Sequence, residues 1–443
     1  MKNLSQTDPE ISNLITKEKL RQINELEMIP SENYVSPAVL EASGSVLTNK
    51  YSEGYPGKRY YAGNAVIDEI EKLAVERAKK LFRVPHVNVQ PYSGSPANLA
   101  VYMAVCKPGD TIMGLDLTHG GHLTHGWKVS ATGIFYKSVQ YHVKADGRID
   151  IEEVKKLVRE HKPKLIWAGA TAYMYEFPFK EFGEIAQNCG AYFACDIAHI
   201  AGLIVAGTHP TPVPYAHIVT TTTHKTLRGP RGAMIMVTGV GIKKDPDLPS
   251  KIDKAVFPGL QGGPHDNTTA AIAVALHEAS TLKFKRYGKQ IVKNAKALAS
   301  GLMERGVKLV GNGTENHLIL LDLTPFFGPG GGYFAHYALE FAGIVGNRNT
   351  IPGEPSSPFY PSGLRLGTPA LTTRGMKEKE MEKIAGFIFE ILDNIKSNKL
   401  PQKKEDRQPY LVKFREEIKK NKNITQIKKE VNQFASRFPI FSY

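Results

Sequence analysis

A lysine between a run of threonines and a glycine-proline turn is the residue of this sequence best placed to do chemistry. Lys225 follows Thr220-Thr221-Thr222-Thr223-His224 and precedes the segment Thr226–Gly232. The apolar pair Ile218 and Val219 predicts a buried strand just before it, so this lysine is held at a strand end. An amine that is partly shielded from water and lies near other cations can lose its proton and form an imine with an aldehyde. An ordinary loop lysine is the open alternative.

Three further groups supply what an imine-forming lysine needs. Ser93-Gly94-Ser95 lies between a predicted strand and a predicted helix, where hydroxyls and helix amides can hold a phosphate. Asp196 ends a predicted strand and can keep a pyridine nitrogen protonated, which makes the ring an electron sink. Arg365, flanked by glycine and apolar residues, suits a substrate carboxylate. The alternatives are that Ser93–Ser95 and Asp196 cap helices and that Arg365 forms a structural ion pair.

A glycine-rich histidine cluster occupies His119–Gly126. Its three histidines, His119, His122 and His125, leave a metal site open as an alternative. The glycines and the lack of an adjacent carboxylate instead favour a loop that lays an imidazole flat against a ring. With the lysine, the aspartate, the phosphate cradle and the arginine, this cluster predicts pyridoxal phosphate chemistry without a metal.

The composition is that of an ordinary globular enzyme. The chain has 443 residues, of which 42% are hydrophobic and 23% charged, and its length predicts two domains. The net charge of +14 comes in large part from C-terminal lysine pairs that alternate with acidic and apolar positions, a pattern typical of solvated amphipathic helices. We therefore expect no specific nucleic-acid binding, although a tail that binds RNA or another polyanion is an open alternative.

The N-terminus and the cysteines predict a cytoplasmic protein. Met1–Glu10 is polar, and no apolar run in the sequence is long enough to cross a bilayer. Cys106, Cys189 and Cys195 lack metal-like spacing and are predicted to be buried free thiols in a reducing compartment. We expect no membrane association.

Short apolar runs alternate with helical patterns through the first two thirds of the chain. Helices are expected at 8–28, 67–82, 96–104, 151–161, 182–189 and 267–283, and strands at 87–90, 111–114, 165–170, 192–197, 218–221 and 233–237. This alternation predicts an α/β fold with a mostly parallel sheet whose ligands lie at the carboxyl ends of the strands. The expected domains are a helical arm over 1–45, a large cofactor-binding domain over 46–268, and a small domain with a basic helical tail over 269–443.

Several segments together resemble serine hydroxymethyltransferases, from about residue 19 to residue 395. The matching segments are Ser31–Tyr34, Leu47–Tyr61, His119–Gly126, Thr220–Gly232, Phe257–Pro264 and Ser362–Ala370. The resemblance implies the fold of type I pyridoxal phosphate enzymes, with a mostly parallel seven-stranded sheet in a large domain and a smaller α/β C-terminal domain. It also implies reversible conversion of L-serine and tetrahydrofolate to glycine and 5,10-methylenetetrahydrofolate.

The resemblance also implies roles for individual residues. Lys225 would bind the cofactor, Asp196 its pyridine nitrogen, His122 the ring face and His199 the phenolic oxygen. The remaining cofactor contacts would be Ser93, Gly94, Ser95, Thr171 and His224, with Gly262 and Gly263 of the partner subunit. The substrate would meet Ser31, Tyr51, Glu53, Tyr61 and Arg365, and the groups that act in catalysis would be Lys225, Glu53, His224 and Tyr51. The folate would meet Tyr60, Leu117, Gly121, His122, Leu123, Asn349, Ser357, Pro358 and Phe359.

In this family two subunits share each active site, so a homodimer is implied, alone or within a tetramer, with Tyr51 and Glu53 reaching into the neighbour's site. Thr171 stands where serine is common in the family, and the glycine-rich segment 328–332 also departs from the usual pattern and is predicted to be a surface turn. A threonine or β-hydroxy-amino-acid aldolase, or a related transferase, is the alternative that keeps the same cofactor.

Overall fold

The computed structural model describes residues 3–441, and the chain divides into two compact units. The sheet unit contains Asn33–Val292 and Thr314–His317, and the terminal unit contains Met1–Glu32, Lys293–Gly313 and Leu318–Tyr443. The expected boundaries at 45/46 and 268/269 differ from these. The N-terminal helices group with the C-terminal part of the chain, and a short piece near residue 315 returns to the sheet unit.

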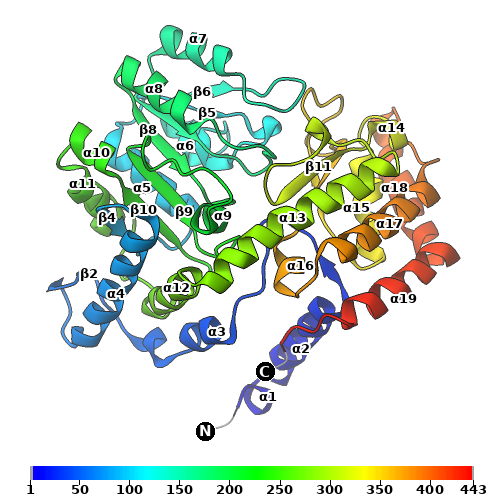
Figure 1. The fold of residues 1–443 in the computed structure, drawn as a ribbon, viewed down its shortest axis with the longest axis horizontal. Coiled ribbons are helices and arrows are strands. Elements are labelled where there is room, and N and C mark those ends of the chain that lie inside the picture. The colour runs from blue at the N-terminus through cyan, green and yellow to red at the C-terminus, as the bar shows by residue number, and fades with distance from the viewer. Residues whose placement is uncertain (1–2, 442–443) are drawn as a thin grey trace. The chain divides into compact units, whose positions relative to one another are not determined.

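A seven-stranded sheet forms the centre of the sheet unit (Figure 1). Its strands are β4 (His86–Asn88), β5 (Thr111–Leu115), β6 (Lys137–Tyr141), β7 (Leu165–Ala168), β8 (Tyr192–Asp196), β9 (Ile218–Thr222) and β10 (Ala233–Val237). Their order is β4-β10-β9-β8-β7-β5-β6, and only β10 runs antiparallel to its neighbours. The expected mostly parallel sheet of an α/β fold is therefore confirmed.

Helices pack along this sheet because most of its strands are apolar and buried. They are α3 (Pro37–Ser43), α4 (Ala65–Phe82), α5 (Gly94–Val105), α6 (Ala131–Phe135), α7 (Ile151–His161), α8 (Phe179–Cys189), α9 (Ala201–Ala206), α10 (Gly239–Lys244), α11 (Leu248–Lys254) and α12 (Asp266–Ala279). Helix α5 contacts β9 and β10, and α7 and α8 lie beside each other near β6 and β7 (Figure 1). The two-stranded ribbon of β2 (Gly54–Tyr55) and β3 (Lys58–Arg59) lies in the segment before α4.

The terminal unit has its own small sheets and core. Its strands are β1 (Leu26–Glu27), β11 (Leu318–Asp322), β12 (Ile344–Val345), β13 (Asn347–Asn349) and β14 (Gly363–Gly367), with an antiparallel sheet in the order β11-β14-β13 and a parallel pair β1-β12. Its helices are α1 (Leu4–Thr7), α2 (Pro9–Asn24), α14 (Thr324–Phe327), α15 (Gly332–Phe341), α16 (Pro369–Thr373), α17 (Glu378–Ile395), α18 (Lys404–Lys420) and α19 (Lys422–Ser436). Helices α2 and α19, from opposite ends of the chain, lie side by side (Figure 1).

The basic tail forms two amphipathic helices, as the alternation of its charges predicts. Helix α18 buries Leu411, Phe414 and Ile418, while its charged side chains stay exposed. The buried residues of α18 and α19 belong to the same core as Leu26 and Met28 from the N-terminal part of the chain. The tail is thus an integral part of the terminal unit.

Three local predictions were wrong. The segment 330–332 is not a surface turn, because Gly330, Gly331 and Gly332 are buried and a methyl group at Gly332 would lie 2.5 Å from the Gly363 oxygen. Cys189 is exposed and Cys106 is half-buried, whereas Cys195 is buried as expected. The helix expected at 267–283 is instead α12 followed by the separate helix α13 (Leu282–Glu304). Across residues 3–441 we find no helix that combines the length and the apolar character of a membrane span.

Candidate active site

The loop after β9 holds the backbone of Lys225 in place. The lysine carbonyl accepts hydrogen bonds from Asn33 Nδ2 at 3.0 Å and from the Arg228 N–H at 3.1 Å. Next to it, Thr226 Oγ1 donates to the His199 carbonyl at 2.9 Å and accepts from the Gly202 N–H at 3.0 Å. The loop therefore fixes the point from which the lysine side chain starts.

Asp196 lies at the end of β8, in register with Thr220 of the neighbouring strand β9. Its Oδ2 accepts from Asn98 Nδ2 at 2.9 Å and from His125 Nε2 at 3.3 Å, and its Oδ1 accepts from the Ala198 N–H at 3.0 Å. Burial alone would raise the pKa of Asp196, but the hydrogen bond from His125, and then the fields of His125 and His122, hold this pKa below its usual range. A carboxylate that stays ionised in a buried place can hold a cation such as a protonated pyridine.

His122 and His125 come from one short 3-10 helix, Leu123–His125, and the residue that caps it. His122 Nδ1 lies 2.7 Å from Thr124 Oγ1 and accepts from the Thr124 N–H at 3.2 Å. Burial, with the neighbouring His125, lowers the pKa of His122 to about 4, so this ring is neutral at pH 7. A neutral imidazole is the form that stacks best on a cationic ring.

His122, His125 and Asp196 also bring three potential metal ligand atoms within 4.8 Å of one another. Oδ2 of the aspartate already accepts hydrogen bonds from Asn98 and His125. The absence of a metal stays a prediction.

The phosphate cradle expected at Ser93–Ser95 lies at the start of α5. Ser93 is the N-cap residue of this helix, but its side chain makes no capping hydrogen bond within the described part of the chain. The alternative of a simple cap is therefore not favoured, since the hydroxyl and the first amides of the helix remain available for an anion. Gly94 is required by packing, because a methyl group there would lie 2.8 Å from Thr222 Cγ2.

Two further predicted cofactor residues have protein partners. Thr171 Oγ1 lies 3.2 Å from the Gly120 carbonyl and 3.1 Å from the Gly121 carbonyl. The Thr171 hydroxyl therefore donates its hydrogen bond to the backbone of the histidine loop. His199 Nδ1 lies 3.2 Å from His317 Nε2, and the two rings are stacked. A contact of either side chain with a cofactor stays a prediction.

A second cluster joins the 50–64 segment to the glycine pair before α12. Tyr51 OH donates to Glu53 Oε1 at 3.1 Å, and this bond raises the pKa of Tyr51. A methyl group at Gly262 would lie 2.9 Å from the same Glu53 oxygen, and one at Gly263 would lie 3.2 Å from the Tyr51 ring. Four predicted residues are therefore neighbours in one chain: Tyr51, Glu53, Gly262 and Gly263.

The Tyr51 cluster borders a cavity of about 430 Å³. Tyr92, which directly precedes the phosphate cradle, donates from its hydroxyl to the Gly263 carbonyl at 2.7 Å. Tyr60 and Tyr61 are 76% and 48% exposed. Of the remaining expected folate contacts in the sheet unit, Leu117 is half-buried, Gly121 is buried and Leu123 is exposed.

The other predicted residues belong to the terminal unit: Ser31, Asn349, Ser357, Pro358, Phe359 and Arg365. Arg365 is buried in β14, where its Nε donates to Asn347 Oδ1 at 3.1 Å and burial lowers its pKa to about 10. The carboxylate of Glu354 accepts from the N–H groups of Ile351, Ser356 and Ser362, and so shapes the loop that carries 357–359. The positions of these residues relative to Lys225 stay a prediction.

Asn98 is a site residue that sequence reasoning missed, and His125 was considered only as one of three possible metal ligands. Asn98 is fully buried and joins Asp196, Thr124 and Thr220 through its amide group. Its position four residues after Gly94 in a helix is a signal that it faces the same side as the cradle. His125 lies three residues after His122, a spacing that puts both imidazoles on one turn.

Comparison with known proteins agrees with this geometry. The family model described as "Serine hydroxymethyltransferase" matches residues 4–388. A serine hydroxymethyltransferase of Sorangium cellulosum is 58% identical over 396 residues, 89% of this chain and 92% of that relative. One of Acidothermus cellulolyticus is 58% identical over 88% of this chain and 89% of its own length, and one of Campylobacter jejuni is 54% identical over 90% and 95%. The chain belongs to the serine hydroxymethyltransferase family.

Proposed function

We propose that this chain catalyses the reversible transfer of the hydroxymethyl carbon of L-serine to tetrahydrofolate, with glycine and 5,10-methylenetetrahydrofolate as products. The observation that carries the proposal is the largely shielded carboxylate of Asp196, which Asn98 and His125 keep ionised on the strand beside the one that leads to Lys225. The membership of the chain in the family supports the same reaction.

The donor set fits pyridoxal phosphate as the cofactor. A carboxylate suits the pyridine nitrogen, a lysine suits the aldehyde, and the hydroxyls with the helix start at Ser93–Ser95 suit the phosphate. When bound, the cofactor stabilises negative charge at the substrate Cα. The neutral His122 would cover one face of the ring, and His199, Thr171 and His224 would complete its surroundings.

The protein groups that act on serine are Tyr51 and Glu53. The Glu53 carboxylate accepts a hydrogen bond from Tyr51, so the pair can hold and pass a proton at the serine hydroxyl oxygen while the Cα–Cβ bond breaks. We assign the substrate carboxylate to Arg365 with Ser31 beside it, because guanidinium binds carboxylate with two parallel hydrogen bonds. Tyr61 would close the substrate pocket.

The folate is assigned to the exposed aromatic and apolar residues of the predicted set. Tyr60, Leu123 and Phe359 are exposed, and the flat rings of Tyr60 and Phe359 can stack on a pteridine while Leu123 offers an apolar contact. Leu117, Gly121, His122, Asn349, Ser357 and Pro358 would line the remainder.

We also propose a homodimer with shared active sites, alone or within a tetramer. Tyr51, Tyr60 and Val66 are large apolar side chains that are more than half exposed in the single chain, at 51%, 76% and 64%. Exposed apolar residues that gather around a site are typical of a surface that a second subunit covers. A cytoplasmic location stays a prediction from the polar N-terminus and the free cysteines.

The purified protein loaded with pyridoxal phosphate tests the cofactor. We expect a near-visible absorbance band that Lys225→Ala loses, and no such band in the unaltered protein would overturn the cofactor assignment. The reaction is tested by conversion of serine to glycine with and without tetrahydrofolate. Serine cleavage that gains nothing from folate, together with rapid threonine cleavage, would identify an aldolase.

Glu53→Gln separates proton transfer from cofactor attachment. An amide keeps the shape of the side chain but cannot accept a proton, so the folate-dependent rate should fall by about 100-fold or more while the absorbance band persists. Full serine activity in this variant would show that another group moves the proton.

A further inference from the structure

The 50–64 segment carries four residues of the proposed site on a short and irregular stretch of chain. Tyr51, Glu53, Tyr60 and Tyr61 lie in it, and its only regular structure is the two-residue strands β2 and β3. Three of these side chains are tyrosines that are 51%, 76% and 48% exposed, so they contribute little buried packing to the segment. Polar contacts hold the segment instead: Ser52 Oγ donates to the Asp266 carboxylate, Tyr55 OH donates to the Asp253 carbonyl, and Arg59 makes a larger set of bonds.

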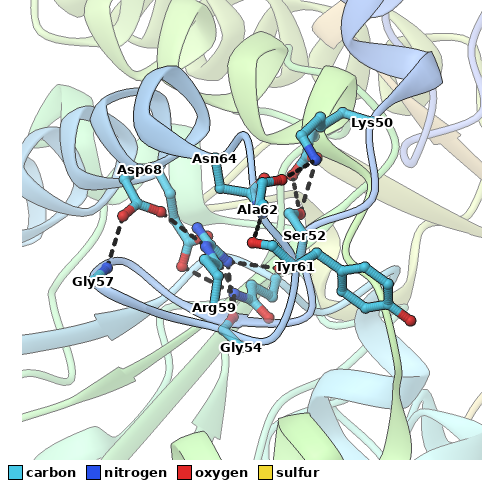
Figure 2. A network of polar contacts seen from close by, with 12 residues as sticks. Lys50, Ser52, Gly54, Gly57, Arg59, Tyr61, Ala62, Asn64 and Asp68 are labelled. Carbon is cyan, nitrogen blue, oxygen red and sulfur yellow. Dashed lines mark hydrogen bonds and ion pairs between the residues drawn. The ribbon is translucent and has the colours of Figure 1, made fainter.

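Arg59 donates hydrogen bonds from all three nitrogens of its guanidinium (Figure 2). Its Nη1 donates to the carbonyls of Ser52 at 2.9 Å and Gly54 at 2.8 Å, on either side of Glu53. Its Nε donates to Asp68 Oδ1 at 2.9 Å, and its Nη2 donates to Glu71 Oε2 at 2.7 Å. The arginine side chain is only 4% exposed.

The carboxylates of Asp68 and Glu71 lie on helix α4 and bind Arg59, which connects the 50–64 segment to this helix. Asp68 also accepts from the Gly57 N–H at 2.7 Å, and so holds the turn between β2 and β3. Glu71 is 5% exposed, and burial raises its pKa against the opposing effect of Arg59. A buried carboxylate and guanidinium that bond each other leave an uncompensated charge if either is removed, so neither partner can leave without the other.

The same contacts connect the segment to the phosphate cradle. Gln90 Nε2 donates to Glu71 and to the Gly54 carbonyl at 2.9 Å, and the Gln90 carbonyl accepts from Gln261 Nε2 at 2.9 Å. Gln261 Oε1 in turn accepts from the Tyr92 N–H at 3.0 Å, one residue before Ser93. Arg59 thus lies at the centre of a continuous network from Glu53 to the start of α5.

We propose that Arg59 is a positioning residue, which fixes the backbone on both sides of Glu53 and so sets the Tyr51–Glu53 pair for proton transfer. The inference rests on the proposed function, because it takes Glu53 as the group that handles the proton. In the proposed dimer, Arg59 of one subunit serves the active site built on Lys225 of the other subunit. Lysine cannot replace it, since one ammonium cannot reach two carbonyls and two carboxylates in four fixed directions.

Arg59→Lys tests whether the several N–H donors of the guanidinium are needed. Asp68→Asn is a milder variant that weakens one of the hydrogen bonds of Arg59. A displacement of reacting groups by about 1 Å lowers rates by about 100-fold, so we expect kcat for serine with tetrahydrofolate to fall by about 10- to 100-fold in Arg59→Lys and less in Asp68→Asn. The KM for serine and the cofactor band should stay close to those of the unaltered protein. Arg148→Lys, at an exposed ion pair with Glu315, is the matched control and should keep full activity.

Hybrid dimers separate positioning from a general loss of stability. If Arg59 serves the partner's site, a hybrid of one Lys225→Ala chain with one Arg59→Lys chain keeps one intact site and about half of the activity. In a hybrid that carries both substitutions on one chain, the only remaining Lys225 lies in the unaltered chain. Its site is served by the Arg59→Lys chain, so this hybrid keeps only a damaged site. The reverse pattern, or equal activity in both hybrids, would overturn the proposal, as would an Arg59→Lys dimer with normal kcat. Failure of the proposed function would appear instead in the unaltered protein, as absence of the band or of serine conversion.

Discussion

At the scale of single residues, the histidine loop controls the charge of the site. His125 Nε2 is bonded to Asp196, while its Nδ1 has no hydrogen-bond partner within the described chain. A buried N–H without an acceptor is costly, so the proton of a neutral His125 belongs on Nε2, where it is donated to the carboxylate. His125 therefore helps to keep Asp196 ionised.

We predict that His125→Phe raises the pKa of Asp196, because the hydrogen bond is lost while a ring remains to stack on Trp167. The acidic limb of kcat/KM for serine should then move to higher pH, and the cofactor should bind more weakly. The measurement is a pH–rate profile with excess cofactor. His142→Phe is the control, since His142 also pairs with a carboxylate but is only half-buried and lies outside the predicted site. Identical acidic limbs for the two variants would contradict the assignment.

His224 gives a prediction about stability. Burial, and then the charge of Lys225, lowers the pKa of His224 to about 3 from the ordinary value of 6.5. Below pH 6.5 His224 becomes protonated in the unfolded chain but stays neutral in the folded chain. The free energy of unfolding therefore falls as the pH drops towards 4. Each such proton contributes a slope of about 1.4 kcal/mol per pH unit.

We therefore expect His224→Asn to flatten the loss of stability between pH 6 and pH 4, measured by urea unfolding of the cofactor-loaded protein. The substitution sacrifices no hydrogen bond at Nδ1, which lacks a partner among residues 3–441. His161→Asn, at an exposed histidine, should leave the slope unchanged. Parallel slopes for His224→Asn and the unaltered protein would show that His224 takes up its proton in the folded state as well.

At the scale of elements, apolar strands were predictable and polar ones were not. Six strands of the central sheet were expected from short apolar runs, and all six appear within two residues of the expected bounds. β6 (Lys137–Tyr141) was missed, because as an edge strand it is mostly half-exposed and carries Lys, Ser and Gln. The break between α12 and α13 was missed because its cause is local, with Ser280 and Thr281 hydroxyls bonded to the carbonyls of the preceding turn.

The same contrast applies to the site. Lys225, Asp196 and the cradle follow strands, so the rule for strand ends predicted their place. Asn98 acts through bonds to Asp196 and Thr220, which lie far away in the sequence, and no local pattern predicts such partners. Contacts between distant segments need the fold itself.

The loop before β14 allows a prediction about an element. Glu354 accepts three backbone N–H bonds and one from the Ser362 hydroxyl at 2.5 Å, so one carboxylate organises residues 351–362. In Glu354→Gln one oxygen becomes an amide that cannot accept these bonds. Each lost bond to a charged acceptor is worth about 1.5–3 kcal/mol, so the loop should exchange its amide hydrogens faster and the KM for folate should rise about 10-fold.

Glu340→Gln, at an exposed helical position, is the control for this variant. The cofactor band should stay unchanged in both, because the cradle lies in the other unit. Normal exchange in the 351–362 loop of Glu354→Gln would show that the carboxylate is dispensable.

At the scale of the whole molecule, the two ends of the chain stabilise each other within the terminal unit. Arg374 is buried and donates to the carbonyls of Glu25 at 2.7 Å, Ala435 at 2.6 Å and Phe438 at 2.9 Å. It thereby joins the end of α2 to the end of α19. Helices α18 and α19 lie beyond the residues that the family model matches, yet they complete the core.

We predict that a chain truncated after Leu400 fails to form a stable terminal unit. The truncation removes seven buried apolar residues, Leu411, Phe414, Ile418, Ile424, Ile427, Val431 and Ala435. At about 1.5–3 kcal/mol for each large side chain, their loss is comparable to the whole stability of a domain, about 5–15 kcal/mol. The truncated chain should aggregate or unfold at a much lower temperature, followed by circular dichroism. Lys419→Gln, which alters only the exposed face of α18, should unfold like the unaltered protein. A truncated chain with an unchanged unfolding temperature would mean that the remaining core closes without the tail, and the tail would then be free to serve a partner.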